Sequence, residues 1–341
     1  MKILFLLNKE LTTHIEAQLP LIKELKKQCN LELLYYKYGE EESIAKSRIN
    51  DNSINIYMSD VISPFSKIYK DLNRPFVFVP HGISAFKPFR PTKNCRHVNS
   101  YIFPSQVWVE QFLTNDIKNN IKDSRLENSY GWSKMDIYYN KIQNKEKIRN
   151  KIYKKYNLNS KKPLVVYAPT GIRQNAGTLE KWKKEYKSQS GYIMHGAYYL
   201  KDKIRKQINK TDVNLIELPH PCIKRGDIDN DRIDVMVASD MLISDISSMA
   251  IEYLAIDKPI ILLQRDIPDR TPLDFKLFSE INKETINIGD IISYKELAET
   301  IEYRLQNDDF KIAREYWKEK LIGKFDGKAS IRAAKLIIET K

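Results

Sequence analysis

The sequence contains little cysteine and no long apolar run. Its three cysteines, Cys29, Cys95 and Cys222, are far apart in a chain of 341 residues and fit neither a pairing pattern nor a zinc-ligand pattern. This argues against a disulfide framework and predicts a reducing, cytoplasmic environment. No apolar stretch approaches the roughly 20 residues of a membrane-spanning helix, so we expect any membrane contact to be peripheral. The short apolar start, Ile3–Leu7, is followed at once by polar residues and predicts a core strand rather than a signal peptide.

Modules typical of nucleic-acid binding are also missing: we find no recognition helix, zinc module or set of aromatic-rich basic strands. The formal net charge is nevertheless +13, from 57 Lys and Arg against 44 Asp and Glu. Such a surface attracts anions, whether nucleic acid, an anionic membrane face or a phosphate-rich substrate. Without the modules, we expect no nucleic-acid partner. Asp229-Asn-Asp231 is a poor Asp-x-Asp metal motif in a polar loop, and we expect neither a metal nor a cofactor.

Positive charge is concentrated between Lys141 and Lys162, where nine residues are basic and only Glu146 is acidic. Apolar residues recur through this segment at rough helical spacing, which predicts a basic amphipathic helix that leads into a linker. Two interpretations remain open. The helix is either a solvated element at a domain junction or a face that binds a membrane or an anionic polymer.

Short, continuous apolar runs alternate with longer amphipathic stretches on both sides of this segment. Continuous runs are typical of parallel strands covered by helices on both faces. The predicted strands are Ile3–Leu7, Leu31–Tyr36, Ser53–Met58, Phe76–Val79 and Ser100–Phe103, then Leu164–Tyr167, Tyr192–Met194, Val213–Leu218, Met241–Ser244 and Pro259–Leu263. The pattern predicts an α/β fold with two doubly wound Rossmann-like lobes, GT-B-like, and a cleft between them. We expect residues 1–150 to form an acceptor-side domain, 151–325 a nucleotide-donor domain, and 326–341 a helix that packs back on the first lobe.

Polar residues follow several of these strands directly. His81 and Gly82 follow Phe76–Val79; glycine permits a tight turn and close ligand approach, and histidine suits proton transfer near neutral pH. The alternative is a histidine bonded only to its own turn. Thr170 and Arg173 follow Leu164–Tyr167 and offer a hydroxyl and a guanidinium to a phosphate.

Two further histidines lie in the second half. His195 follows the predicted strand Tyr192–Met194 and precedes a glycine, whereas His220 lies between two prolines in a rigid, extended segment. Either histidine could contact a donor phosphate while the other is structural. The sequence leaves this choice open.

The most informative segment runs from Ala238 to Ile260. A buried strand ends at Ser244 and Asp245, and Ser247 and Ser248 then open a helix whose free amides and dipole form an anion site for a diphosphate. Glu252, one turn later, can point back to the same pocket and accept sugar hydroxyls. The alternative is that the two serines only cap the helix.

This segment resembles the Ser-Asp signature of the CDP-glycerol glycerophosphotransferase family, the enzymes of teichoic acid and capsule polymers. Other pieces match in the family's order: His81-Gly82, the turn Gly131-Trp-Ser-Lys134-Met-Asp136, Tyr167-Ala-Pro-Thr170 with Arg173, and His195. The chain departs from the family pattern at four places. Ile246 stands where the family has a tyrosine, and Glu252 where it has an aspartate. Gly171-Ile172 takes the place of a tryptophan, and Gly196 follows the second histidine. These departures leave the polyol open.

The resemblance implies transfer of a polyol-phosphate from a CDP-activated donor to a hydroxyl of a cell-envelope polymer or lipid-linked acceptor, with release of CMP. Glycerol-phosphate is the leading candidate for the transferred group. It implies His81 and His195 as catalytic residues. It implies donor contacts from Thr170, Arg173, Ser244, Asp245, Ser247, Ser248 and Glu252, with Gly82, Lys134, Asp136 and His220 as secondary candidates. An anionic acceptor and peripheral contact with the inner membrane face fit the charge. The alternative is a nucleotide-sugar glycosyltransferase or a UDP-sugar 2-epimerase of the same GT-B-like fold.

Overall fold

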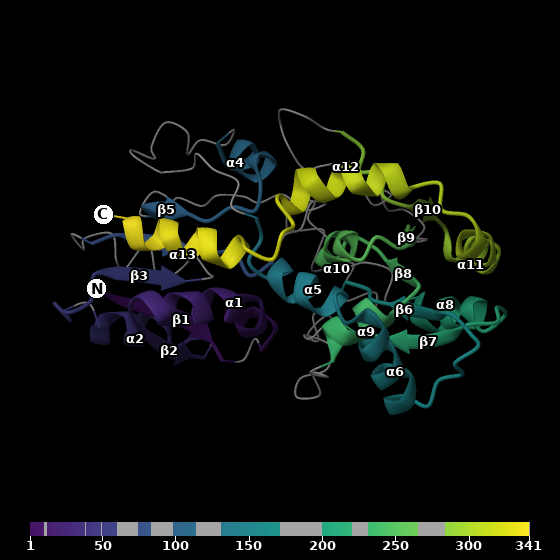
Figure 1. Ribbon diagram of the computed structural model, residues 1–341, viewed down its shortest axis with the longest axis horizontal. Helices are drawn as coiled ribbons and strands as arrows, with labels where there is room; N and C mark the ends of the chain where they lie inside the picture. Colours follow the sequence, from purple (N-terminus) through teal and green to yellow (C-terminus); the bar gives the residue numbers. More distant parts are fainter. Residues whose placement is uncertain are drawn as a thin grey trace, which may run out of the picture. The chain divides into compact units, whose positions relative to one another are not determined.

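The computed structural model describes residues 1–9, 12–37, 39–48, 50–59, 74–82, 98–113, 131–170, 200–219, 231–264 and 284–340. The chain divides into two compact units (Figure 1). The first comprises Met1–Asn140, Leu277–Glu284 and Lys318–Lys341, and the second comprises Lys141–Lys276 and Thr285–Trp317. In the described part of the chain, each unit contains one parallel sheet of five strands. The predicted α/β fold with two parallel sheets is confirmed.

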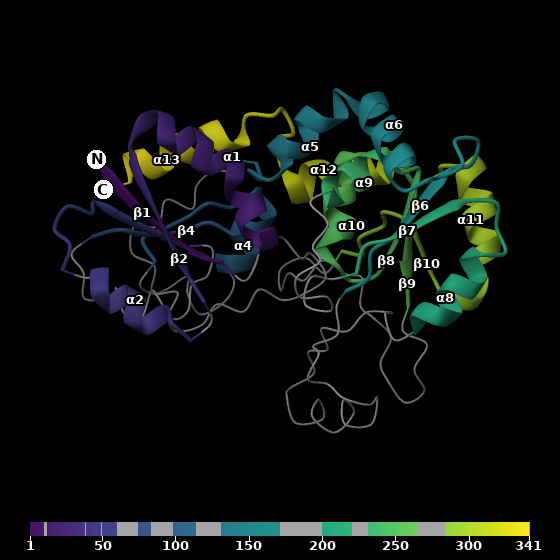
Figure 2. The ribbon, with the colours of Figure 1, turned by 90° about the horizontal axis from the view of Figure 1, so that it is seen from below.

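The sheet of the first unit has the strand order β2-β1-β3-β4-β5. The strands are β1 (Lys2–Asn8), β2 (Asn30–Tyr36), β3 (Ile56–Ser59), β4 (Phe76–Phe78) and β5 (Ser100–Tyr101). Helices α1 (Thr12–Gln28) and α13 (Ala329–Glu339) cover one face, and α2 (Glu41–Arg48) lies on the other (Figure 2). Apolar residues of β1, α1 and α13 share one core, because each element presents a continuous apolar stripe to it. The C-terminal helix thus belongs to the first unit.

The sheet of the second unit has the order β10-β9-β8-β6-β7. Its strands are β6 (Leu164–Tyr167), β7 (Asn214–Glu217), β8 (Met241–Ser244), β9 (Ile260–Leu263) and β10 (Asp290–Ile292). Figure 2 shows α8 (Lys201–Ile208) and α11 (Leu297–Gln306) on one face, with α6 (Lys145–Lys155) and α9 (Arg232–Ala238) on the other. Apolar side chains of α8 and α11 pack against β6, β8 and β9. The predicted strand Tyr192–Met194 lies outside the described residues, and β10 was not predicted.

Both sheets repeat one topology. Counting each unit's described strands in chain order, the arrangement is 2-1-3-4-5, and the strand order reverses between the first and third strands. Ligands of such sheets bind beyond the carboxyl ends of the strands at this switch point. The switch point lies between β1 and β3 in the first unit and between β6 and β8 in the second.

The basic segment forms two helices rather than one: α5 (Met135–Ile142) ends before α6 begins at Lys145. Five of its nine basic residues make ion pairs with carboxylates of the same unit, which favours the solvated-junction interpretation for that part of the segment; these are Lys141, Arg149, Lys151, Lys155 and Lys162. The remaining elements are α4 (Gln106–Leu113), α10 (Ser248–Glu252), η4 (Tyr253–Ala255), η5 (Tyr294–Glu296) and α12 (Lys311–Ile322). None of the helices described is both long and apolar enough to cross a membrane.

Candidate functional site

In the first unit, polar residues gather where the strands end. Asn8 ends β1 and Ser59 ends β3, and both are buried at the switch point. His81 follows β4 after two further residues and is half-buried. The carboxyl ends of adjacent parallel strands meet at one edge, so His81 lies at the edge where the topology places a ligand.

His81 is stacked on a second histidine. The ring of His14, in the first turn of α1, lies 3.3 Å from the ring of His81 between centroids, with the planes 15° from parallel. One turn later on the same helix, Gln18 is buried, and its Nε2 donates a hydrogen bond of 3.1 Å to the carbonyl of Val79. Residues four apart share a helix face, so α1 holds both the strand end and the histidine ring that follows it.

Gly82 is less constrained than the sequence analysis expects. Its φ is outside the left-handed region, and a Cβ at this position would meet no atom within 4 Å in the described part of the chain. Nothing in that part of the chain requires a glycine there. Close approach of a ligand after His81 stays a prediction.

In the second unit, the two segments that follow β6 and β8 are bonded to each other. The carboxylate of Asp245 is fully buried and accepts hydrogen bonds from the backbone N–H of Thr170 at 2.9 and 3.1 Å and from its hydroxyl at 2.6 Å. Ser244 is also fully buried and donates its hydroxyl to the carbonyl of Ala168 at 2.6 Å. A buried carboxylate is costly unless it is hydrogen-bonded, so Asp245 and Thr170 fix each other at the switch point.

The helix after β8 begins as expected. Ser247 is the N-cap of α10, and its hydroxyl accepts from the backbone N–H of Met249 at 3.3 Å. Ser248 opens the helix and is half-buried, while Glu252 ends it with 2% of its surface exposed. The capping role of Ser247 is thus present. Donor contacts from Ser247, Ser248 and Glu252 stay predictions.

The turn with Lys134 and Asp136 has a structural task in the first unit. Asp136 is buried and accepts from the backbone N–H groups of Ala329 at 3.0 Å and Ser330 at 2.8 Å, and from the Ser330 hydroxyl. These groups form the first turn of α13, where free N–H groups and the helix dipole favour a carboxylate. Asp136 therefore anchors the C-terminal helix. Lys134 is buried with its ammonium 5.7 Å from the Trp132 ring centroid.

Three of the predicted site residues, Arg173, His195 and His220, lie outside the described residues. His14 and Gln18 are the residues that the sequence analysis missed. A signal was present for His14, because it lies in the first turn of the helix that directly follows β1. No group of three or more His, Cys, Asp or Glu side chains able to hold a metal ion occurs among the residues with described positions.

Comparison with known proteins decides the family. Residues 90–339 match the family described as CDP-Glycerol:Poly(glycerophosphate) glycerophosphotransferase. The chain belongs to this family. The match covers well over half of the chain and includes every motif named above, apart from His81-Gly82, His14 and Gln18.

Other relatives agree with the glycerophosphotransferase family. The teichoic acid glycerol-phosphate primase of Bacillus spizizenii is 29% identical over 140 residues, which are 40% of this chain and 34% of the primase. The match thus spans about a third of that relative's length. The solved structure of the wall teichoic acid polymerase TagF has a TM-score of 0.64 at 17% identity, over 99% of this chain and 88% of that chain.

The fold is shared more widely than the family. A UDP-GlcNAc 2-epimerase from Methanocaldococcus jannaschii has a TM-score of 0.59 at 14% identity, over 99% of this chain and all of that chain. At this identity the likeness shows the GT-B-like fold alone. The family that the chain matches is that of the glycerophosphotransferases. This match favours the glycerophosphotransferase interpretation over the epimerase alternative.

Proposed function

We propose that this protein transfers a glycerol-phosphate group from CDP-glycerol to a hydroxyl of a cell-envelope polymer or lipid-linked acceptor and releases CMP. The observation that carries the proposal is the bond between Thr170 and Asp245. It joins two family segments 75 residues apart at the ligand-binding switch point of the second sheet. Family membership supports the donor, and a TagF structure soaked with CDPG has the same fold at a TM-score of 0.58.

The proposed reaction is a displacement at phosphorus. The acceptor hydroxyl oxygen forms a bond to the phosphorus that carries glycerol, the bond from that phosphorus to the bridging oxygen breaks, and CMP leaves with the bridging oxygen. His81 takes the proton of the hydroxyl as general base, a role worth about 10²- to 10⁴-fold in rate. His195, Arg173 and the amides at Ser247 and Ser248 offset the charge on the phosphoryl oxygens.

Two of the proposed donor residues have side chains that are bonded within the fold. Ser244 and Asp245 have no exposed surface, and their side chains are bonded to Ala168 and Thr170. We infer that these two shape the loop after β6, while Thr170, Ser247, Ser248, Glu252 and Arg173 contact the donor. His14 and Gln18 have the matching role in the first unit, because they hold His81 and Val79.

The net charge supports the proposed acceptor and the proposed membrane contact. A net charge of +13 favours a phosphate-rich polymer and an anionic membrane face. We propose peripheral contact with such a membrane. Sedimentation with vesicles of phosphatidylglycerol, compared with phosphatidylcholine, tests it: binding to the anionic vesicles alone is expected, and equal or absent binding contradicts it.

A donor panel tests the proposed function. The purified protein is incubated with CDP-glycerol, CDP-ribitol, UDP-N-acetylglucosamine or a CMP-linked sugar, and thermal stabilisation and nucleotide release are measured. We expect stabilisation by CDP-glycerol together with slow CMP release. Stabilisation by the UDP-sugar alone would leave the fold intact and contradict the chemistry.

A further inference from the structure

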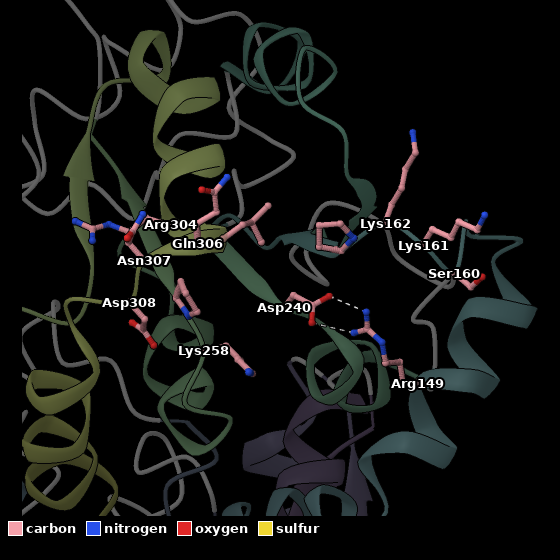
Figure 3. Close-up of a pocket in the computed structure, with 13 residues that line it drawn as sticks. Arg149, Ser160, Lys161, Lys162, Asp240, Lys258, Arg304, Gln306, Asn307 and Asp308 are labelled. Atoms are coloured by element: carbon pink, nitrogen blue, oxygen red, sulfur yellow. Dashed lines mark hydrogen bonds and ion pairs between the residues drawn. The ribbon is translucent and has the colours of Figure 1, made fainter.

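A cavity of about 410 Å³ lies in the second unit at the amino end of its sheet (Figure 3). Its lining includes Pro163, directly before β6, Asp240, directly before β8, and Pro259, directly before β9. Thr170 and Asp245 follow the opposite ends of β6 and β8. A four-residue strand is about 13 Å long, so the cavity is separate from the proposed donor site.

The lining is predominantly basic. Five of its residues are cationic and two are acidic; the cations are Arg149, Lys161, Lys162, Lys258 and Arg304. The two carboxylates are already held by arginines. Asp240 accepts hydrogen bonds of 3.0 and 2.9 Å from Arg149, and Asp308 accepts two of 2.6 Å from the buried Arg314, which lies outside the lining.

In the part of the chain that the structure describes, the positive charges of several lysines at or near the cavity lack the carboxylate partners that the arginines have. Among the described residues, the lining lysines Lys161 and Lys258 form no ion pair with a carboxylate, and neither does Lys145, which lies outside the lining. Lys145 lies one turn before Arg149 on α6; burial and the charge of Lys258 hold the pKa of its ammonium below the ordinary value. Figure 3 shows Lys258 on the same side of the cavity as the Arg149–Asp240 pair. The Lys258 ammonium, which lines the cavity, therefore lies close enough to a second cation for the two to repel, and a bound anion stabilises such an arrangement.

We propose that this cavity binds a segment of a phosphodiester polymer, with Lys161 and Lys258 as the phosphate contacts. Separate ammonium groups around an open polar cavity suit successive phosphates on a flexible chain, since each lysine acts as a point charge. The site lies away from the donor end of the sheet, so it holds a part of the acceptor remote from the reacting hydroxyl. A second contact of this kind raises the affinity for long acceptors. That the polymer is poly(glycerol-phosphate) rests on the proposed function.

The test compares two double variants of equal charge. Lys161→Gln with Lys258→Gln removes two cations of the cavity lining, whereas Lys147→Gln with Lys154→Gln removes two exposed cations of α6 outside that lining. Binding of a short glycerol-phosphate oligomer is measured by calorimetry. We expect the cavity variant to bind about tenfold more weakly, the effect of removing two partly exposed ion pairs. The control variant should bind as the wild type does.

Two further measurements separate this inference from the proposed function. CMP release from CDP-glycerol without acceptor should be equal in both double variants and the wild type. Equal oligomer binding by all three proteins would overturn the polymer site while leaving the donor chemistry intact. Oligomer binding that depends on the cavity lysines, without any CMP release, would support the site and contradict the proposed function.

Inorganic tripolyphosphate is the control for phosphate recognition. It should compete with the oligomer, because the lysines act as point charges; a failure to compete would overturn the lysines as phosphate contacts. Thermal unfolding of both double variants shows whether they fold. If the cavity double variant does not, the single variants Lys161→Gln and Lys258→Gln are compared with Lys147→Gln, with a loss of oligomer binding expected only in the first two.

Discussion

The rings of His14 and His81 stack 3.3 Å apart between centroids, although the two residues are 67 positions apart in the chain. His14 belongs to α1 and His81 follows β4. Gln18 of α1 binds the carbonyl of Val79 through its Nε2 at 3.1 Å. The helix thus fixes the backbone and the ring plane at the position of the proposed general base.

Replacing His14 should therefore slow the reaction without weakening the donor complex. We expect His14→Ala to lower kcat about tenfold or more, because a misplaced catalytic group costs up to about 10²-fold, while KM for CDP-glycerol stays near the wild-type value. His14→Phe, which keeps a flat ring for stacking, should retain most of kcat. Equal losses in both variants would contradict a positioning role, as would a change in KM alone.

The bond between Thr170 and Asp245 predicts a loss of both stability and donor affinity. Thr170→Val removes the hydroxyl that donates to the buried carboxylate at 2.6 Å, which should cost about 1–3 kcal/mol in the free energy of unfolding. Thr170→Ser keeps the donor and should be near neutral. Urea unfolding measures the first effect and KM for CDP-glycerol the second. A Thr170→Val protein with wild-type stability and KM would contradict the role assigned to this bond.

Asp136 should matter for stability and not for chemistry. Asp136→Ala leaves the first N–H groups of α13 without their carboxylate, and we expect a loss of about 1–3 kcal/mol. Asp212→Ala, at a position where 83% of the side chain is exposed, is the matched control and should change little. The turnover per folded molecule should be equal in both. A catalytic defect in folded Asp136→Ala would restore Asp136 as a site residue.

The pair of Asp308 and Arg314 predicts a dependence of stability on pH. Hydrogen bonds from Arg314 hold the pKa of Asp308 below its ordinary value, so the pair stabilises the fold above the unfolded pKa of about 3.9. This contribution is lost as the pH falls through the lower, folded pKa. Asp308→Asn should reduce stability at pH 7, and the difference from the wild type should shrink below about pH 4. A constant difference across this range would contradict the assignment.

The fold could be predicted from the sequence because the strands are continuous apolar runs. Met241–Ser244 and Leu164–Tyr167 were predicted with the bounds that the structure gives. β10 could not be found, since Asp290–Ile292 is a short, partly exposed edge strand without such a run. The break before α6 was missed because helical spacing continues through Asn144.

The candidate site could be predicted only in part. The rule that polar residues follow strands located His81, Thr170 and Asp245. This rule does not say which residues those side chains contact. The contacts of His14 and of Asp245 could therefore be found only in the tertiary structure. For Asp136 the structure adds a contact that the motif alone does not indicate, the bonds to the first turn of α13, while a site role for Lys134 and Asp136 stays a prediction.

The most direct test of the account is the turnover of CDP-glycerol by wild-type protein and His81→Ala, with CMP release and transfer to a glycerol-phosphate primer measured in one assay. CMP release coupled to transfer is expected in the wild type. In His81→Ala we expect a loss of about 10²-fold or more in kcat, with donor-induced thermal stabilisation retained. Near-normal turnover in His81→Ala, or no CMP release by the wild type with any primer, would contradict it.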